Sequence, residues 1–183
     1  EVPGAGCCGG VRFHLNDQEA GRDDMRALID AWWTLVAGRE TEAIVATASG
    51  CGVTIKDYAH LLALDQNYRG KAERVSELTR DLSEVIRPAD LPEGTNRGRV
   101  AFQSPCSLQH GMQLGGRVEE ILQAIGLELL PVADSHLCCG SSGTYSLLQP
   151  KLSGQLKAAK LRNLEEGEPQ LIASANIGCM SHL

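Results

Sequence analysis

Apolar residues in the second half of the chain alternate between short runs and helical spacing. Three short runs, at residues 100–102, 127–132 and 171–173, predict β-strands. Two segments between them, 117–125 and 151–166, carry apolar residues at the spacing of a helix face. The positions expected on the buried faces are Val118, Ile121, Leu122, Ile125, Leu152, Leu156, Ala159 and Leu164. Strands that alternate with helices in this way predict parallel β-α-β units.

The first half repeats the later part of this order. Residues 23–37 have a strong apolar face and predict a helix, and residues 43–46 predict the strand that follows it. Residues 2–3 are expected to end an earlier strand. Two further helices are predicted at 56–64 and 71–86. The repeated order indicates that the two halves have related folds.

The predicted fold class is α/β, with two pseudo-symmetric halves whose short, mainly parallel sheets are flanked by helices. We expect a first half-domain at residues 1–90, truncated at its N-terminus, and a second at residues 99–183. A polar, glycine-rich linker at 91–98 would join them. Ligands of such sheets bind at the carboxyl ends of the strands, so the loops after the strands should converge at that edge.

Composition excludes several classes of function. The 183 residues carry a net charge of -6 and no basic stripe, which argues against nucleic-acid binding. No apolar run is long enough to predict a transmembrane segment, and no secretory signal is visible. The sequence begins at Glu1 without a methionine, and the repeat is incomplete at that end. We therefore expect the chain to be a piece of a longer protein.

Seven cysteines lie close to the ends of the predicted strands. Two adjacent pairs each precede a glycine, and each pair is followed about 40 residues later by a single cysteine. The first set is Cys7, Cys8 and Cys51, and the second is Cys106, Cys138, Cys139 and Cys179. A disulfide between adjacent cysteines is strained, but both sulfurs of such a pair can face one metal centre. A neighbouring glycine lets backbone N–H groups approach a negatively charged cluster.

Three interpretations of these cysteines are open. They could be small buried apolar residues, although their place beside glycines at strand ends does not favour this. Zinc sites usually show paired knuckles, and only Cys179 and His182 have that spacing. An iron–sulfur cluster accepts varied cysteine spacing and is favoured. His182, His136 and His110 are candidate ligands or hydrogen-bond donors to sulfur. The first set would need a fourth ligand from an upstream segment.

Longer motifs carry a family resemblance. They are Gly6–Gly9, His14–Asn16, Ile29–Trp33, Thr47–Gly52, Pro105–His110, Asp134–Ser141 and Ala175–Cys179. Together they closely resemble the glycolate oxidase iron-sulfur subunit, in the cysteine-rich CCG region that it shares with heterodisulfide reductases and lactate-oxidation iron-sulfur proteins. Heterodisulfide reductase motifs end in Cys-x-x-Cys, whereas Thr54 and His182 stand at the final positions here. A site with four rather than five cysteine ligands is therefore expected.

The resemblance implies an electron-transfer subunit that holds an iron–sulfur cluster, with [4Fe-4S] as the expected type. Flavin-containing subunits would oxidise glycolate to glyoxylate, and this subunit would pass the electrons toward a quinone-linked acceptor. No substrate chemistry is expected within the chain itself. The resemblance also implies a cytoplasmic protein, free or attached through the complex to the inner face of the membrane. Family members carry an N-terminal ferredoxin-like domain that this sequence does not include.

Three alternatives compete with this function. The chain could be a zinc-bound or metal-free assembly module that docks the flavin subunits. It could also be the iron–sulfur subunit of a lactate-oxidising complex, because substrate contacts would lie on the flavin subunit. Thiol–disulfide catalysis at Cys138 and Cys139 is disfavoured, because no nearby Lys or Arg marks a lowered thiol pKa there.

Overall fold

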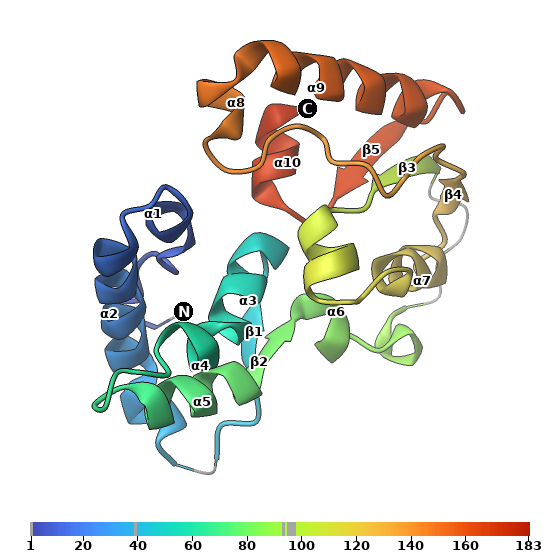
Figure 1. The fold of residues 1–183 in the computed structure, drawn as a ribbon. Coiled ribbons are helices and arrows are strands. Elements are labelled where there is room, and N and C mark those ends of the chain that lie inside the picture. The colour runs from blue at the N-terminus through green and yellow to red at the C-terminus, as the bar shows by residue number, and fades with distance from the viewer. Residues whose placement is uncertain (1, 39, 93, 95–97) are drawn as a thin grey trace. The chain divides into compact units, whose positions relative to one another are not determined.

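The chain divides into two compact units in the computed structural model, which describes residues 2–38, 40–92, 94 and 98–183 (Figure 1). The first unit comprises the chain up to Ala46 together with Cys51–Arg80, and the second comprises Thr47–Gly50 together with Asp81–Leu183. The predicted linker at 91–98 falls partly outside the described residues. The proposed boundary between half-domains therefore stays a prediction.

The first unit is mainly helical. Its elements are α1 (Gly10–His14), α2 (Gln18–Val36), β1 (Ile44–Ala46), α3 (Ser49–Lys56), α4 (Tyr58–Leu61), α5 (Arg69–Leu78) and β2 (Thr79–Asp81). β1 and β2 form a two-stranded sheet. The long helix α2 has a marked apolar face, and its buried side chains pack with those of the later helices. The members of this core are Met25, Leu28, Ile29, Val36, Ile55, Tyr58, Leu62, Ala72, Val75 and Leu78.

Three predictions for the first unit were wrong in detail. The helix expected at 71–86 is interrupted by β2, because Thr79 adopts an extended backbone and Asp81 then caps a new helix, α6 (Leu82–Val85). The Asp81 carboxylate accepts from Ser83 N–H at 2.9 Å, while the Glu84 carboxylate accepts from Asp81 N–H at 2.8 Å. Such a capping box starts a helix and therefore separates it from the preceding one.

The strand expected to end at Val2 and Pro3 is also wrong. Residues 2–9 form turns and irregular backbone, and no strand is assigned within them. Pro3 has no N–H for a strand ladder, and Gly4 has a φ of 81°, which belongs to a turn. The helix expected at 56–64 is likewise shorter, because α3 ends at Lys56 and α4 covers Tyr58–Leu61.

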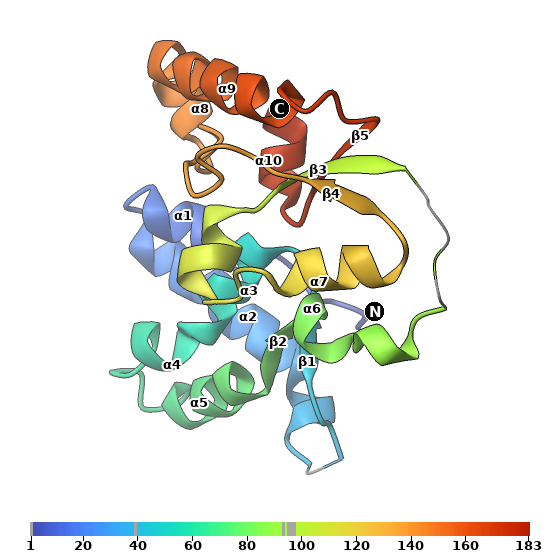
Figure 2. The ribbon, with the colours of Figure 1, turned by 90° about the vertical axis from the view of Figure 1, so that its right-hand side faces the viewer.

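The second unit is built on a three-stranded parallel sheet, which confirms the predicted α/β class. The order is β4-β3-β5, and Val100 of β3 pairs with Leu129 of β4 and Leu171 of β5. Its elements are α6, η1 (Pro88–Asp90), β3 (Arg99–Gln103), η2 (Ser107–Gly111), α7 (Arg117–Ala124), β4 (Glu128–Leu130), α8 (Tyr145–Leu148), α9 (Pro150–Glu165), β5 (Leu171–Ser174) and α10 (Ile177–His182). Helices α7 and α9 lie on opposite sides of the sheet (Figure 2).

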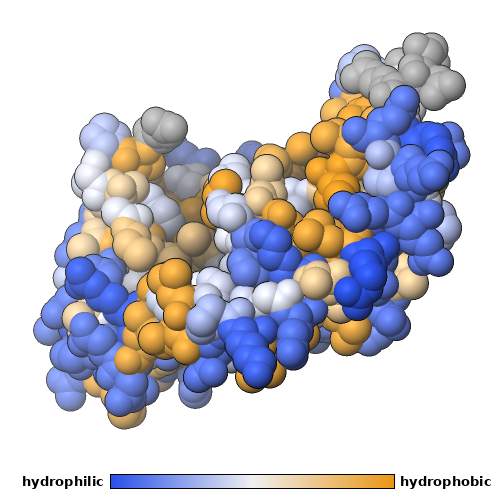
Figure 3. All heavy atoms as spheres, turned by 90° about the horizontal axis from the view of Figure 1, so that it is seen from above, coloured by the Kyte–Doolittle hydropathy of each residue, from blue (hydrophilic) through white to orange (hydrophobic). Residues whose placement is uncertain are grey.

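The buried face of α9 agrees only in part with the predicted one, because Leu164 is buried but Leu152 and Leu156 are not. Its buried residues are Ser153, Lys160 and Leu164, whereas Leu152 is 51% and Leu156 40% exposed. These two leucines therefore belong to the exposed apolar surface of the chain. Figure 3 shows apolar side chains at several places on the face seen from above. Among the described residues, no helix combines the length and the apolar character needed to cross a membrane.

Two leucines of the first unit, two positions apart, provide a matched test of its core. Leu62 is 1% exposed and belongs to the core, while Leu64 is 99% exposed. Leu62→Ala should lower the free energy of unfolding by about 2–5 kcal/mol, because a buried cavity is left. Leu64→Ala should change it by less than about 0.5 kcal/mol. Both tryptophans, Trp32 and Trp33, lie in α2, so urea unfolding followed by tryptophan fluorescence reports on this unit. Equal effects of the two changes would contradict the assigned core.

Candidate metal centre

Four cysteines of the second unit follow the carboxyl ends of the three parallel strands. Cys106 lies three residues after the end of β3, and Cys179 lies in α10, just after β5. Cys138 and Cys139 lie in the loop that follows β4. Because parallel strands end at the same edge of a sheet, three distant segments deliver their thiols to one place.

The thiols of these cysteines form a connected row. The sulfur of Cys138 shares hydrogen bonds with Cys106 and Cys139, and Cys139 in turn shares one with Cys179. Cys106 is exposed, Cys138 is half-buried, and Cys139 and Cys179 are buried. All seven cysteines of the chain are free thiols. The row therefore runs from the surface into the interior without a disulfide.

These hydrogen bonds lower the pKa values of two of the thiols. Hydrogen bonds from Cys106 and then from Cys139 hold the pKa of Cys138 well below its ordinary value. The hydrogen bond from Cys139 likewise lowers the pKa of Cys179. The donors Cys106 and Cys139 have raised pKa values for the same reason, and burial raises them further. Cys138 and Cys179 are thus the first thiolates of the row, and the thiolate is the form that binds metals.

Gly140 shapes the turn that carries the cysteine pair. Its N–H donates to Cys138 Sγ at 3.3 Å, and its φ of 94° lies in the left-handed region. A Cβ at this position would lie 2.7 Å from the carbonyl oxygen of Ser153 in α9. The Ser153 hydroxyl donates to the carbonyl of Gly140 at 2.9 Å. Only glycine lets the turn lie this close to α9. This contact is a second reason for glycine here, beside the predicted approach of backbone N–H groups to a cluster.

Lys160 is a residue of the site that the sequence analysis missed. It lies on the buried face of α9, is 2% exposed, and donates to the carbonyls of Ser135 at 2.8 Å and Asp134 at 3.3 Å. Its charge helps to lower the pKa values of Cys138 and Cys179. The expectation that no cation lies near the cysteine pair was therefore wrong. The sequence holds no signal for it, because its hydrogen-bond partners are backbone carbonyls of another segment.

A partly buried group of three polar side chains holds the beginnings of η2 and α10. The hydroxyls of Ser49 and Ser107 lie 2.7 Å apart, and the side-chain amide of Asn176 donates to both, at 3.3 Å and 3.2 Å. The Asn176 side-chain oxygen also accepts from Gly178 N–H at 2.8 Å and so caps α10. These bonds fix the segments that carry Cys106 and Cys179.

The three candidate histidines differ in their surroundings. His182 Nε2 lies 3.1 Å from the Ser153 hydroxyl, beside the Gly140 turn, and Lys157 donates to its backbone carbonyl. His110 and His136 are exposed. A role for any of the three as a metal ligand stays a prediction. His182 contributes at least to the hydrogen-bonded support behind the cysteine turn.

The first unit contains a smaller version of the same arrangement. Cys7, Cys8 and Cys51 are connected through Cys8, whose hydrogen bond lowers the pKa of Cys51 to about 7. Gly9 N–H donates to Cys7 Sγ at 3.4 Å, the counterpart of the bond at Gly140. Gly9 also has a positive φ of 77°, and a Cβ there would overlap the carbonyl oxygen of Gly21 in α2. The two turns therefore use glycine in the same way.

Tyr58 supports the first cysteine turn from behind. It is fully buried, and its hydroxyl donates to the carbonyl of Cys8 at 2.8 Å. Burial is the main cause that raises its pKa, and the neighbouring cysteine sulfurs raise it further. The phenol therefore stays neutral and acts as a donor to this backbone.

In the described part of the chain, no group of three or more His, Cys, Asp or Glu side chains is arranged to hold a metal ion. A metal ion requires ligands around one point, whereas a cluster distributes its cysteines over several iron atoms. A connected row of thiols fits a cluster with several iron atoms rather than a single metal ion. The shared centre of Cys106, Cys138, Cys139 and Cys179 stays a prediction.

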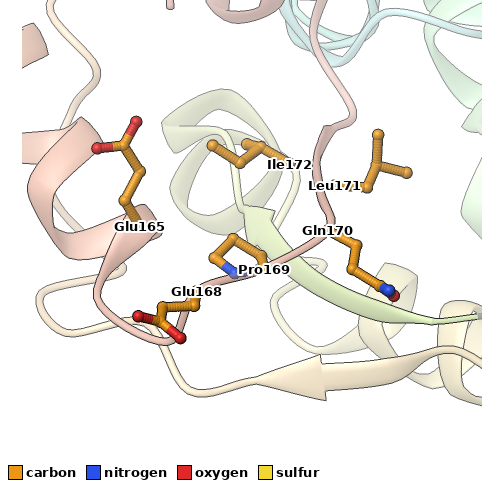
Figure 4. Close-up of a pocket in the computed structure, with 6 residues that line it drawn as sticks. All are labelled: Glu165, Glu168, Pro169, Gln170, Leu171 and Ile172. Atoms are coloured by element: carbon orange, nitrogen blue, oxygen red, sulfur yellow. The ribbon is translucent and has the colours of Figure 1, made fainter.

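A shallow pocket of about 390 Å³ lies elsewhere in the second unit. Its lining comes from the end of α9, the following turn and the start of β5, as Figure 4 shows: Glu165, Glu168, Pro169, Gln170, Leu171 and Ile172. It therefore lies at the amino end of β5, and none of its lining residues is a cysteine. Ligand sites of parallel sheets lie at the other edge, so the cysteine row is the better candidate.

The fold and the two cysteine groups define a class of α/β protein whose thiols gather beside Cys-Cys-Gly turns. The model of the cysteine-rich domain family, CCG, matches residues 1–56 and 100–183, and the chain belongs to this family.

Three relatives extend this comparison. The glycolate oxidase iron-sulfur subunit of Escherichia coli (strain K12) is 49% identical over 98% of the chain, which covers 44% of that relative. Lactate utilization protein A of Geobacillus thermodenitrificans is 29% identical over 97% of the chain and 73% of its own length. A probable glycolate oxidase iron-sulfur subunit of Bacillus subtilis is 27% identical over 97% of the chain and 40% of its own length. The chain thus spans less than half of the two glycolate oxidase relatives.

Substitution of two glycines separates backbone strain from crowding at the cysteine turn. Gly140→Ala should destabilise the second unit by more than the roughly 1–2 kcal/mol of a left-handed residue, because the new Cβ also meets Ser153 and Leu156. Gly143 also has a positive φ, of 61°, but has open space around it, so Gly143→Ala should show the backbone cost alone. Denaturant unfolding followed by circular dichroism measures both. A Gly140→Ala protein as stable as Gly143→Ala would contradict the close packing.

Proposed function

We propose that the chain is the cysteine-rich, electron-transferring part of the iron–sulfur subunit of a glycolate-oxidising complex. The observation that carries this proposal is the row of four thiols at the carboxyl edge of the parallel sheet. The 49% identity to a glycolate oxidase iron-sulfur subunit supports it over nearly the whole chain.

The residues present fit an iron–sulfur cluster. Cys106, Cys138, Cys139 and Cys179 supply four thiolates, which is the ligand number of such clusters, and [4Fe-4S] is the type that we propose. The Gly140 N–H already donates to a sulfur, as in many sites that stabilise negative charge. When bound, the cluster accepts and releases single electrons. The protein supplies ligands, a backbone donor and a buried cation, and it keeps part of the row away from water.

The cysteines of the first unit are proposed as an incomplete second site. Cys7, Cys8 and Cys51 supply three thiolates, so a fourth ligand would come from outside this chain. The half-domains at 1–90 and 99–183 would then each carry one site. This proposal rests on the matched turns at Gly9 and Gly140.

We further propose the place of the chain within the complex. Flavin-containing subunits would oxidise glycolate to glyoxylate and deliver electrons to the cysteine centres, which pass them on toward a quinone-linked acceptor. The chain would act as an oxidoreductase subunit on the cytoplasmic side, free or attached to the membrane through its partners. Lactate is the second candidate substrate of the complex, because a lactate utilization relative matches 97% of the chain and is itself 73% covered.

Anaerobic purification, visible absorption and metal analysis test the proposal. An iron–sulfur protein shows sulfur-to-iron charge-transfer bands together with iron and sulfide. Zinc without colour would instead favour a zinc-bound assembly module that docks the flavin subunits. Colourless protein without metal would favour a metal-free docking role, and either of these results would contradict electron transfer by this chain.

Two cysteine variants test which unit holds the centre. Cys139→Ser should remove the cluster, because Cys139 connects Cys138 with Cys179 and a site short of one thiolate binds metal weakly. Cys8→Ser should leave that cluster in place, because Cys8 belongs to the other unit. Iron per chain and the visible spectrum after anaerobic reconstitution measure both. Two clusters per wild-type chain, or full iron in Cys139→Ser, would contradict this assignment.

A further inference from the structure

Lys160 occupies a position where a charged residue is costly. It is 2% exposed and lies on the buried face of α9, in the same stripe as Ser153 and Leu164. Lysine is almost never fully buried unless its charge has partners, because an ammonium loses its hydration there. Something in the second unit must therefore stabilise this charge.

The partners of Lys160 all belong to the cysteine site. Its ammonium donates to the carbonyls of Asp134 and Ser135, which lie three to four residues before the cysteine pair. It also interacts electrostatically with the sulfurs of Cys138, Cys139 and Cys179. The two hydrogen bonds to carbonyls use two of the three N–H donors of the ammonium. Because carbonyls carry no net charge, these bonds do not balance its positive charge. Negative charge on these sulfurs, together with that of the Asp134 carboxylate, supplies the remaining stabilisation.

The first unit has a leucine at the corresponding place. The carbonyl of Gly21 in α2 contacts the Gly9 turn, as the carbonyl of Ser153 in α9 contacts the Gly140 turn. Seven residues beyond these contacts stand Leu28 and Lys160, and both side chains are buried. The two units therefore share a scaffold but differ by one positive charge beside the cysteines. A purely structural position would be filled by an apolar residue, as it is in α2.

We propose that Lys160 is a positioning residue that holds a fixed positive charge beside the thiolates of the second unit and thereby raises the reduction potential of the centre bound there. This inference rests on the proposed function, since it requires a redox centre on the four cysteines.

The physical basis is the charge balance of electron uptake. One-electron reduction adds one negative charge to the centre, and a cation at short range in a poorly polarisable interior stabilises that added charge. The electron would come from a reduced flavin group of the complex, or from dithionite with redox mediators in the laboratory. Lys160 neither gains nor loses a bond in this step, because its role is electrostatic.

Three substitutions separate the charge of Lys160 from its hydrogen bonds. Lys160→Arg keeps the charge, Lys160→Gln keeps a donor without charge, and Lys160→Met keeps only the bulk. Lys151→Gln is the matched control, because Lys151 lies in the same helix and is exposed. Each full chain is reconstituted anaerobically, its iron content is measured, and its reduction potential is determined by titration followed by electron paramagnetic resonance.

Lys160→Gln and Lys160→Met should have lower reduction potentials than wild type, while Lys160→Arg and Lys151→Gln should stay close to it. If Lys160→Gln fails to load iron while Lys160→Arg loads fully, the need for the charge is supported by iron content instead. An iron-loaded Lys160→Gln with the wild-type potential, or iron loss in Lys160→Arg as well, would overturn the inference. Wild-type protein without iron would contradict the proposed function itself, and with it the inference.

Discussion

The contact between a glycine turn and a helix carbonyl is the constraint on which both units depend. At Gly9 and Gly140 the backbone has a positive φ, and the N–H of each glycine donates to the sulfur of the first cysteine of the pair. A Cβ at either position would clash with a backbone carbonyl oxygen of α2 or α9. One residue thus sets the direction of both thiols, supplies a donor to sulfur and fixes the distance to α2 or α9. A residue with a Cβ could not combine the direction of the thiols, the N–H donor and the short distance to the helix.

The parallel sheet positions the two thiols that the turn does not carry. The turn brings together two neighbouring thiols, while the other two come from segments that follow β3 and β5. Parallel pairing places these strand ends at one edge, and the hydrogen bonds of Asn176 with Ser49 and Ser107 then hold the segments that follow. Four thiols from distant parts of the chain are therefore positioned by the pairing of the strands and by a few partly buried side-chain hydrogen bonds.

The sequence predicts the elements with strong periodicity and misses what tertiary contacts decide. The strands β3, β4 and β5 and the helices α2, α7 and α9 lie close to their predicted positions, and the four cysteines of the second unit follow the strand ends as expected. The apolar spacing favours one continuous helix over residues 71–86. The capping box at Asp81 instead starts a new helix there, so the helix is interrupted at Thr79–Asp81. Lys160 was missed because its partners are backbone carbonyls of another segment, which no pattern of side chains reveals.

The burial of Lys160 also bears on how the two units differ in stability. An ammonium taken out of water costs several kcal/mol after relaxation, and two bonds to carbonyls offset only part of that cost. Negative charge on the Asp134 carboxylate and on the sulfurs of Cys138, Cys139 and Cys179 offsets the rest, so the lysine and the thiolates stabilise each other. Leu28 imposes no such requirement in the first unit, where burial of an apolar side chain is favourable by itself. The fold of the second unit is thus coupled to the charge of its cysteines, whereas the core of the first unit is held by apolar packing.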